Sequence, residues 1–392
     1  MSHLSTRIVR TFADLVDLGP CWDAWSDGVP FRSPLWSFTW WRHYGRRAPG
    51  TWSTPQLCVL VVERDGRTIG IAPWFIERMV VGGRVLRLLG TGEICSDYLT
   101  LLSQPEDREE VAAAVAAELC GPLRRAWDRI DLDTLPADEF GLRSIVAECE
   151  RRGAVVDRRP GPNCWRLALP SDYEAYLASL SKSHRKEQRQ LAKRVLDTDR
   201  AAWHTARTDS EFDRGWEVLV DLHQRRRRSL GEPGCFASPR FAAFHRDVAR
   251  QLLDQRRLRL QWLEVDGRPI AAEYHFSGGG AIYGYQAGVD PDRLDEEPGR
   301  LAGIAVVRQA IAEGFTRYDL LRGDEPYKKH WRAEPTATEH VSIVAPKPSS
   351  RLRYGALQHL RCLKRRLTAR RPDVAAPAES ATKPNVAEPT TV

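Results

Sequence analysis

Long apolar runs are absent from this chain of 392 residues. No stretch approaches the ~18 uncharged apolar residues that a helix needs to cross a bilayer. The first seven residues contain no basic segment followed by an apolar run, so we expect no secretory signal. With 42% hydrophobic and 28% charged residues, the composition is that of a soluble globular protein.

Cysteine and histidine are present, but without the spacings of metal sites or disulfide frameworks. The eight cysteines include no C-x-x-C pair, and the ten histidines show no metal-ligand spacing. We therefore expect reduced, mostly buried thiols, a cytoplasmic protein and no bound metal.

Lysine is scarce, since only eight of the 59 basic residues are lysine. The formal net charge is +7, yet positions 351 to 371 hold eight basic residues and no acid, which leaves 7 − 8 = −1 for the rest. The positive charge is therefore a property of the C-terminal segment and not of the body.

That C-terminal segment has the pattern of a basic amphipathic helix. One helical stripe holds its apolar residues, Leu352, Ala356, Leu360, Leu363 and Leu367, and the other face holds arginine and lysine. Such a helix suits an anionic membrane surface, and packing of the apolar stripe on the body is an equal alternative. Beyond Pro372, sequence rich in Ala, Pro, Glu and Thr predicts disorder.

The same order of elements occurs twice along the chain. In each half an Asp-Gly pair, Asp65-Gly66 or Asp266-Gly267, joins two β-rich runs, which is typical of a hairpin with a type I′ turn. After the next helix, Ile130-Asp131-Leu132 corresponds to Tyr318-Asp319-Leu320. We predict an α/β protein with mixed sheets, in which two related domains, 1–160 and 161–346, precede a tail at 347–392.

Two segments of the second half carry candidate chemistry. The turn before Gly299 opens a helix whose N–H groups and positive end suit a pyrophosphate, with an ordinary capped helix as the alternative. The segment from Asp319 to Trp331 follows the carboxyl end of a predicted strand, where α/β folds bind ligands. The alternative there is a solvated loop with Trp331 as a core plug.

A third segment is basic. Residues 182–189 (KSHRKEQR) predict a helix with a basic face that can hold phosphates of a donor, of a nucleotide-linked acceptor or of RNA. A solvated helix face is the alternative. His223 lies close to the arginine run at 225–228, where a structural histidine is the alternative to a binding residue.

Several of these residues together carry a family resemblance, which extends from about Thr6 to Val344. They are Phe31-Arg32-Ser33-Pro34-Leu35-Trp36, Ser96-Asp97-Tyr98, residues 180–189, Leu222-His223 with Gly231 and Gly234-Cys235-Phe236, Pro298-Gly299 and residues 318–331. The chain resembles the CelD-type acyltransferases of the GNAT superfamily, which are similar in turn to the Fem-type peptidyltransferases of cell-wall synthesis.

The resemblance implies two tandem GNAT-like domains with a cleft between them and transfer of an acyl group to an amine. The donor would be acetyl-CoA or another acyl-CoA, and the acceptor an amine on a small metabolite or on a cell-envelope or polysaccharide precursor. The Fem branch uses aminoacyl-tRNA instead. Because Arg300-Leu301-Ala302-Gly303 only approximates the GNAT pyrophosphate motif, both donors stay open, as does a non-catalytic GNAT-fold binding protein.

This interpretation assigns site residues in three groups. The expected general bases are Asp97, Glu273 and Asp324, and Tyr285 is an expected acid. The expected donor site consists of Gly299, Arg300, Leu301, Ala302 and Gly303. The expected substrate contacts are Arg185, His223, Arg322, Glu325, Tyr327, Lys328 and Trp331. Backbone N–H groups on a splayed strand would stabilise the oxyanion, and the basic tail would allow peripheral contact with the inner membrane face.

Overall fold

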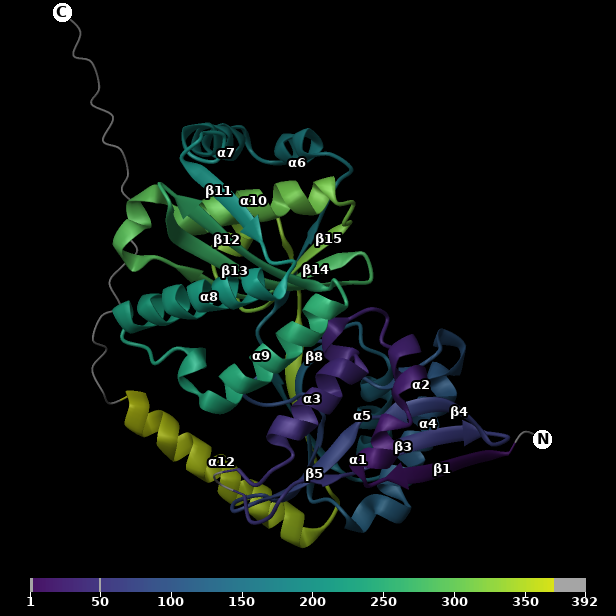
Figure 1. The fold of residues 1–392 in the computed structure, drawn as a ribbon. Coiled ribbons are helices and arrows are strands. Elements are labelled where there is room, and N and C mark those ends of the chain that lie inside the picture. Colours follow the sequence, from purple (N-terminus) through teal and green to yellow (C-terminus); the bar gives the residue numbers. More distant parts are fainter. Residues whose placement is uncertain (1–2, 49–50, 370–392) are drawn as a thin grey trace, which may run out of the picture.

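The computed structural model describes residues 3–48 and 51–369 of the chain, which form two adjoining lobes (Figure 1). The N-terminal lobe holds a four-stranded and a six-stranded sheet, and the C-terminal lobe holds a seven-stranded sheet. The segment beyond Pro372, for which the sequence predicts disorder, lies outside the described residues. In the described ranges, no helix combines the length and apolar content needed to cross a membrane.

The N-terminal lobe is built from residues 3–48 and 51–160 and from the last described strand and helix. Its elements are β1 (Leu4–Val9), α1 (Phe12–Val16), α2 (Gly19–Ala24), α3 (Pro34–Tyr44), β2 (Gln56–Leu57), β3 (Val59–Arg64), β4 (Arg67–Ala72), β5 (Trp74–Met79), β6 (Gly83–Leu88), β7 (Leu102–Ser103), α4 (Arg108–Cys120), β8 (Arg129–Pro136), α5 (Gly141–Arg151), β9 (Val155–Pro160), β17 (Thr338–Val344) and α12 (Pro348–Ala369).

The C-terminal lobe takes the segment between β9 and β17. Its elements are β10 (Cys164–Ala168), α6 (Tyr173–Ser179), α7 (Lys182–Arg194), β11 (Ala201–Thr205), α8 (Asp209–Ser229), η4 (Cys235–Ala237), α9 (Pro239–Asp254), β12 (Leu258–Val265), β13 (Arg268–Gly278), β14 (Ala281–Val289), η5 (Pro291–Glu296), α10 (Pro298–Ala312), β15 (Arg317–Arg322), α11 (Tyr327–His330) and β16 (Glu334–Thr336). Helices α8 and α9 cover one face of its sheet, and α6, α7 and α10 cover the other (Figure 1).

Local sequence explains where several helices begin. Ser33 accepts a hydrogen bond from the Trp36 N–H at the start of α3, and Pro34 follows it as the first helical residue, as predicted. Thr208 and Glu211 form a reciprocal capping box at the start of α8. These caps satisfy backbone donors that the helices themselves leave unpaired.

The predicted duplication is visible in the strand order of both lobes. Each Asp-Gly pair turns a hairpin, with positive φ at Asp65 (52°), Gly66 (78°), Asp266 (53°) and Gly267 (71°). Further along each lobe, two parallel strands are joined by a helix: β6 and β8 through α4, and β14 and β15 through α10. The predicted class, a mixed α/β protein, is therefore confirmed.

The chain returns to the N-terminal lobe for its last described strand. β10 is inserted between β15 and β16 of the C-terminal sheet, and β17 returns to pair with β8 and β9 of the N-terminal sheet. The predicted boundary after residue 160 coincides with the passage from β9 to β10. The predicted domain 161–346, however, includes β17, which completes the other lobe's sheet.

A shared core joins the two lobes. Trp36 of α3 packs against Phe244 of α9 and Phe276 of β13, with ring centroids 5.1 and 5.5 Å apart. Phe31 lies 6.0 Å from both Phe276 and Tyr283. Burial of so many aromatic rings at the junction holds the lobes in one arrangement.

The two parallel strands of the C-terminal lobe separate toward their carboxyl ends. β14 and β15 pair only over Ala281 to Tyr283 and Arg317 to Asp319. Beyond this ladder β14 continues along β13 alone, so its edge toward β15 has no strand partner from Gly284 onward. A Cβ at Gly284 would lie 3.1 Å from the Tyr318 ring, which explains glycine at the point of separation.

Candidate active site

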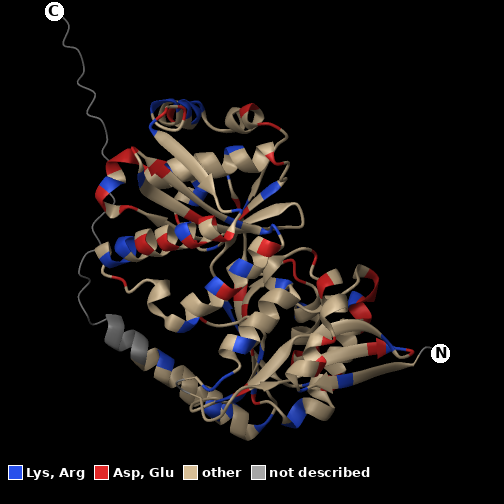
Figure 2. Cartoon of the chain, in the orientation of Figure 1, with Lys and Arg blue, Asp and Glu red and all other residues tan. Residues whose placement is uncertain are grey.

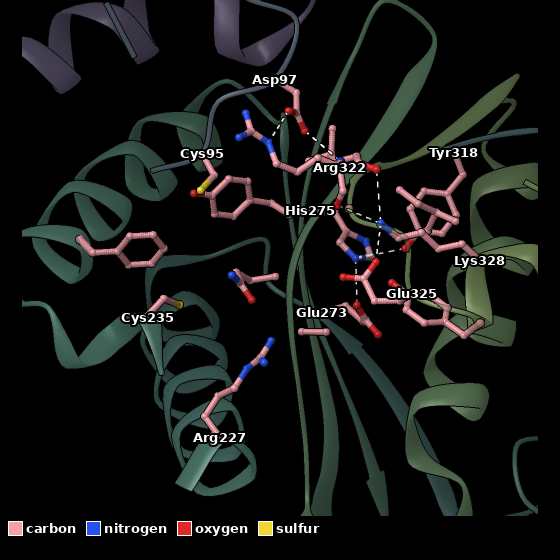
Figure 3. Close-up of a pocket in the computed structure, with 18 of the residues that line it drawn as sticks. Cys95, Asp97, Arg227, Cys235, Glu273, His275, Tyr318, Arg322, Glu325 and Lys328 are labelled. Carbon is pink, nitrogen blue, oxygen red and sulfur yellow. Dashed lines mark hydrogen bonds and ion pairs between the residues drawn. The ribbon is translucent and has the colours of Figure 1, made fainter. Parts of the chain in front are cut away.

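A cavity of about 430 Å³ opens where β14 and β15 separate (Figure 3). Residues of both lobes line it, because the N-terminal lobe contributes a loop that includes Glu93, Cys95 and Asp97. The wall includes seven of the residues predicted for the site: Asp97, Glu273, Tyr285, Arg322, Glu325, Tyr327 and Lys328. Residues 150 or more positions apart in the sequence are thus brought to one place.

Glu273 and His275 lie next to each other on β13, at the base of the cavity. The alternation of side chains along a strand turns both away from Tyr274, which packs in the core beneath α8 and α9. A Glu273 carboxylate oxygen lies 2.9 Å from His275 Nε2, and the Tyr318 hydroxyl lies 3.4 Å from the same nitrogen. Glu273 is 9% exposed and His275 is 1% exposed, so water barely reaches this pair.

His275 retains one unsatisfied ring nitrogen. An ionised Glu273 only accepts hydrogen bonds, so the contact requires the proton on Nε2. Nδ1 is then an acceptor, and it is buried without a hydrogen-bond partner. A buried polar atom without a partner at a cavity wall is costly unless a ligand donates to it.

Asp97 is engaged by Arg322 at the end of β15. Its carboxylate accepts from the Arg322 backbone N–H at 3.0 Å and from Nε at 2.6 Å, and Arg322 also donates to the Ser96 carbonyl at 2.7 Å. Burial raises the pKa of Asp97, and the charge of Arg322 opposes that rise. Because both carboxylate oxygens are taken, the geometry corrects the predicted role: Asp97 holds Arg322 and is not placed to act as a base.

Lys328 closes the carboxyl end of β15. Its ammonium group donates to the carbonyls of Leu321, Arg322 and Gly323 at 3.0 to 3.3 Å and lies 2.9 Å from Glu325. The side chain is only 2% exposed. Lys328 therefore stabilises the turn that shapes the cavity, since three carbonyls converge on one charge.

Tyr285 and Tyr327, two predicted site residues in the cavity wall, differ in the surroundings of their hydroxyl groups. Tyr285 donates to the Ile94 carbonyl at 2.6 Å and packs among aromatic rings, so its proton is already committed. Tyr327 begins α11 and is 49% exposed. Partial burial of this half-exposed residue, with the negative charges of Glu325 and Glu273, raises the pKa of Tyr327, which keeps its hydroxyl protonated at neutral pH.

Cys235 lines the cavity and contacts His223, an arrangement that the sequence analysis did not predict. Its thiol lies 3.5 Å from His223 Nε2, and His223 Nδ1 lies 3.1 Å from the Gln224 side-chain oxygen. Gln224 in turn donates to the Pro233 carbonyl at 3.0 Å. His223 is 2% exposed and is separated from the cavity by Cys235, so its predicted substrate contact is indirect.

Beneath the cavity, Asp319 ties β15 to the N-terminal lobe. Its carboxylate accepts from the Tyr98 hydroxyl at 2.9 Å and from the Leu321 N–H at 3.0 Å, and Arg166 lies 3.4 Å away. Burial raises the pKa of Asp319 to about 6. This network fixes the strand on which the cavity is built.

Asp324 and Trp331 lie outside the cavity wall. The Asp324 carboxylate accepts from the Asn163 side chain at 2.7 Å and from the Trp165 ring nitrogen at 3.1 Å, and these donors lower its pKa. The predicted role of Asp324 as a base is therefore not supported by its position. Trp331 packs on α10, where a Cβ at Gly303 would lie 2.4 Å from the Trp331 ring.

The predicted donor site at the start of α10 contains both buried and open positions. Leu301 and Ala302 are fully buried, and Gly303 makes room for Trp331, so their side chains serve packing. Gly299 and Arg300 lie in the first turn of α10, which has no side-chain cap. Arg300 pairs with Glu297 and with Glu187 of α7 at 3.4 Å.

Helix α7 presents the basic face that the sequence predicts (Figure 2). Lys182 and Lys186 are exposed, and Arg185 is partly exposed. Arg194 at its end lies 3.4 Å from Glu297, so α7 runs beside the start of α10. Arg185 belongs to this basic surface and not to the cavity wall.

Sequence reasoning missed His275, Cys235 and Cys95. A signal for His275 was present, because it shares the period of two with Glu273 on a strand. No spacing pattern in the sequence indicates Cys95 as a site residue. It reaches the cavity wall only because a loop of the N-terminal lobe folds against the C-terminal lobe. Among the described residues, no group of three or more metal-ligating side chains is gathered together.

Comparisons with known proteins address the class of the fold. Residues 182–329 match the family described as "Acetyltransferase (GNAT) domain". No curated protein sequence matches the chain.

Among solved structures, that of FemX superposes with a TM-score of 0.58 at 12% identity, covering 89% of this chain and 99% of that one. A conserved protein of unknown function from Bacteroides thetaiotaomicron gives a TM-score of 0.52 at 10% identity over 87% of this chain and 100% of that one. The C-terminal domain of a putative lysylphosphatidylglycerol synthetase from Agrobacterium fabrum gives 0.50 at 9% identity over 88% and 95% of the two chains. The chain thus shares its fold with these proteins across both lobes, and residues 182–329 of the C-terminal lobe are similar to GNAT acetyltransferase domains.

Proposed function

We propose that the chain is an N-acyltransferase that takes an acyl group from an acyl-CoA and transfers it to an amine bound in the cavity. The observation that carries the proposal is the separation of β14 from β15, which leaves the β14 edge without a strand partner from Gly284 onward. Backbone N–H groups at such an edge can bind the acyl carbonyl oxygen and stabilise the charge that develops on it.

Glu273 is the general base of this proposal. It lines the cavity, is almost fully buried and is held by His275. When the neutral amine attacks the thioester carbonyl, Glu273 takes up the amine proton. The Tyr327 hydroxyl at the cavity wall donates a proton to the departing thiolate and regains one from solvent. Glu273 releases the amine proton to solvent, so both groups return to their starting states and the transfer is balanced.

The first turn of α10 is the proposed site for the donor's phosphates. It has no side-chain cap. Pro298 has no N–H and the Arg300 N–H donates to the Glu297 carbonyl at 3.0 Å, so the Gly299 N–H and the positive end of the helix are left to bind an anion. Arg300 adds a charge there, and the Arg194 side chain on α7 lies close by, since both pair with Glu297.

For the acceptor we propose an amine on a cell-envelope or polysaccharide precursor or on a small metabolite, as the resemblance to CelD-type acyltransferases implies. The cavity volume of about 430 Å³ is in the range of pockets that bind small molecules. The wall offers Glu93, Glu325 and Arg227 to polar groups of such an acceptor.

A Fem-like transfer from aminoacyl-tRNA is the second candidate. The observation that favours it is the exposed basic face of α7 beside α10, which suits an RNA backbone (Figure 2). A non-catalytic role would be favoured by a plugged cleft, but Trp331 packs on Gly303 outside the cavity wall.

Isothermal titration tests the donor. We expect acetyl-CoA or a longer acyl-CoA to bind, and we expect Glu273→Gln to bind the same donor unchanged because Glu273 acts on the amine. If no acyl-CoA binds, the proposal fails. Binding of charged tRNA that weakens steeply as salt is raised would then support the second candidate, because phosphate contacts release counterions.

A further inference from the structure

Helix α12 docks on the N-terminal lobe through polar side chains. Ser350 donates to Asp128 at 2.9 Å, and Gln358 donates to Asp157 at 2.7 Å. Tyr354 donates to the same Asp157 carboxylate. These residues recur at intervals of four, so they form the helix face that meets the lobe.

The leucines of the α12 stripe whose side chains are described face away from the lobe. Leu352 is 77% exposed, Leu360 is 49% exposed and Leu363 is 44% exposed. A helix that merely covers a soluble domain buries its apolar face and exposes its polar one. Of the two alternatives that the sequence leaves open, packing of the stripe on the body is therefore excluded for these leucines.

A second exposed apolar group lies beside this stripe. A hollow of about 770 Å³ is lined by Ala356 and Arg353 of α12 and by Trp52, Val80 and Val81 near the β5–β6 hairpin. Trp52 is 65% exposed and Val80 is 55% exposed. We call the surface of Trp52, Val80, Leu352, Ala356, Leu360 and Leu363 the α12 face.

Positive charge surrounds the α12 face. Arg353 and Arg84 lie 3.1 and 3.5 Å from the single buried acid Asp128. Burial lowers the pKa of the neighbouring Lys347; Asp128 opposes this, and the charges of Arg84, Arg353 and Arg125 add to it. The part of α12 whose side chains are described, 348–363, contains three basic residues, Arg351, Arg353 and Arg361, and no acid. Together with Arg84 and Lys347, these basic residues outnumber Asp128 and Asp157, the acids that α12 contacts, so the surface attracts anions.

We propose that the α12 face binds the surface of an anionic lipid bilayer. Exposed leucines and a tryptophan suit the boundary between headgroups and acyl chains, and arginines beside them suit lipid phosphates. A second copy of the chain fits less well, because a symmetric contact would set the same positive charges against each other. The inference does not depend on acyl transfer, since the cavity between β14 and β15 shares no lining residue with the hollow beside α12.

Co-sedimentation of the full chain with vesicles tests the proposal. One set of vesicles is pure phosphatidylcholine, and the other contains about 30 mole per cent phosphatidylglycerol. We expect at least about tenfold tighter binding to the second set, weakened by added salt. The double variant Leu352→Glu/Leu360→Glu should lose about tenfold or more of that affinity, because two charges then face the acyl chains.

Val16→Glu in α1 is the matched control, since Val16 is 46% exposed and lies outside the α12 face. It should bind vesicles as the unaltered chain does. Equal binding to both lipid compositions, or undiminished binding of the double variant, overturns the proposal. A change in oligomeric mass of the double variant by light scattering, without a change in vesicle binding, assigns the face to self-association and overturns it as well. Because the substituted leucines are exposed, unchanged circular dichroism is expected for every variant.

Discussion

Asp97 and Arg322, 225 positions apart in the sequence, form a buried ion pair that joins the two lobes at the cavity wall. The Asp97 carboxylate is 1% exposed, and the Arg322 side chain is 19% exposed. The pair sets the position of the β15 end relative to the loop of the N-terminal lobe, and the cavity between β14 and β15 depends on that position.

Asp97→Asn should destabilise the protein by about 3 kcal/mol, because it removes the buried carboxylate charge that pairs with Arg322 at 2.6 Å and leaves only the more distant, half-exposed Asp133. Urea denaturation followed by tryptophan fluorescence measures the change. Asp133→Asn is the control, since that carboxylate is 46% exposed and lies 3.7 Å from Arg322. Asp133→Asn should lower the free energy of unfolding by less than about 1 kcal/mol. Similar losses of unfolding free energy in the two variants would contradict the role of Asp97 as the main partner of Arg322.

Glu273→Gln should lower kcat/KM for the amine acceptor by about 10² to 10⁴-fold, because the glutamine amide cannot take up a proton. Steady-state kinetics with a saturating donor measures this change. Glu217→Gln makes the same substitution at an exposed site on α8 and should leave the rate unchanged. A Glu273→Gln enzyme of full activity would exclude Glu273 as the base.

Asp319 should make folding stability depend on pH between about 4 and 6. In the unfolded chain this carboxyl loses its proton near its ordinary pKa of 3.8, whereas in the folded chain burial raises the pKa to about 6. Folding therefore favours the protonated form. This contribution is complete below pH 3.8 and is lost as the pH rises to about 6.

The difference in pKa corresponds to about 3 kcal/mol at most. Urea denaturation of the unaltered chain and of Asp319→Asn at several pH values tests this, because the variant lacks the titrating group. We expect the stability of Asp319→Asn relative to the unaltered chain to rise as the pH is raised through this range. A difference that stays constant with pH would show that Asp319 titrates alike in both states.

Two glycines of α10 should respond differently to substitution. A Cβ at Gly303 would lie 2.4 Å from the Trp331 ring, whereas the nearest atom to a Cβ at Gly299 would be a Val289 methyl at 3.7 Å. Gly303→Ala should therefore destabilise the protein by about 1 to 3 kcal/mol. Gly299→Ala should cost nothing or stabilise by about 0.5 kcal/mol, since alanine favours the helix.

Gly299→Val should leave the fold intact and weaken acyl-CoA binding, because the larger side chain crowds the backbone that the phosphates approach. Thermal unfolding and isothermal titration separate the two effects. Unchanged acyl-CoA affinity of Gly299→Val would move the donor's phosphates away from the start of α10.

Features that depend on a few neighbouring residues could be predicted from the sequence. The Asp-Gly turns, the Ser33-Pro34 helix start and the alternation that turns Glu273 and His275 to one side of β13 are all local. Turn geometry, capping and side-chain period act within one or two turns of chain, so their signals survive in the sequence. The duplicated order of elements could be predicted because the same local signals occur in both halves of the sequence.

The remaining features depend on long-range contacts, for which the sequence carries no local signal. Nothing near Asp97 identifies Arg322 as its partner, and nothing in β17 indicates that it pairs with β8 of the first lobe. The amphipathic pattern of α12 likewise predicts a helix but not which face it turns to the protein. That outcome depends on Asp128 and Asp157, two acids of the distant N-terminal lobe, which accept hydrogen bonds from the polar face and so leave the leucines outside.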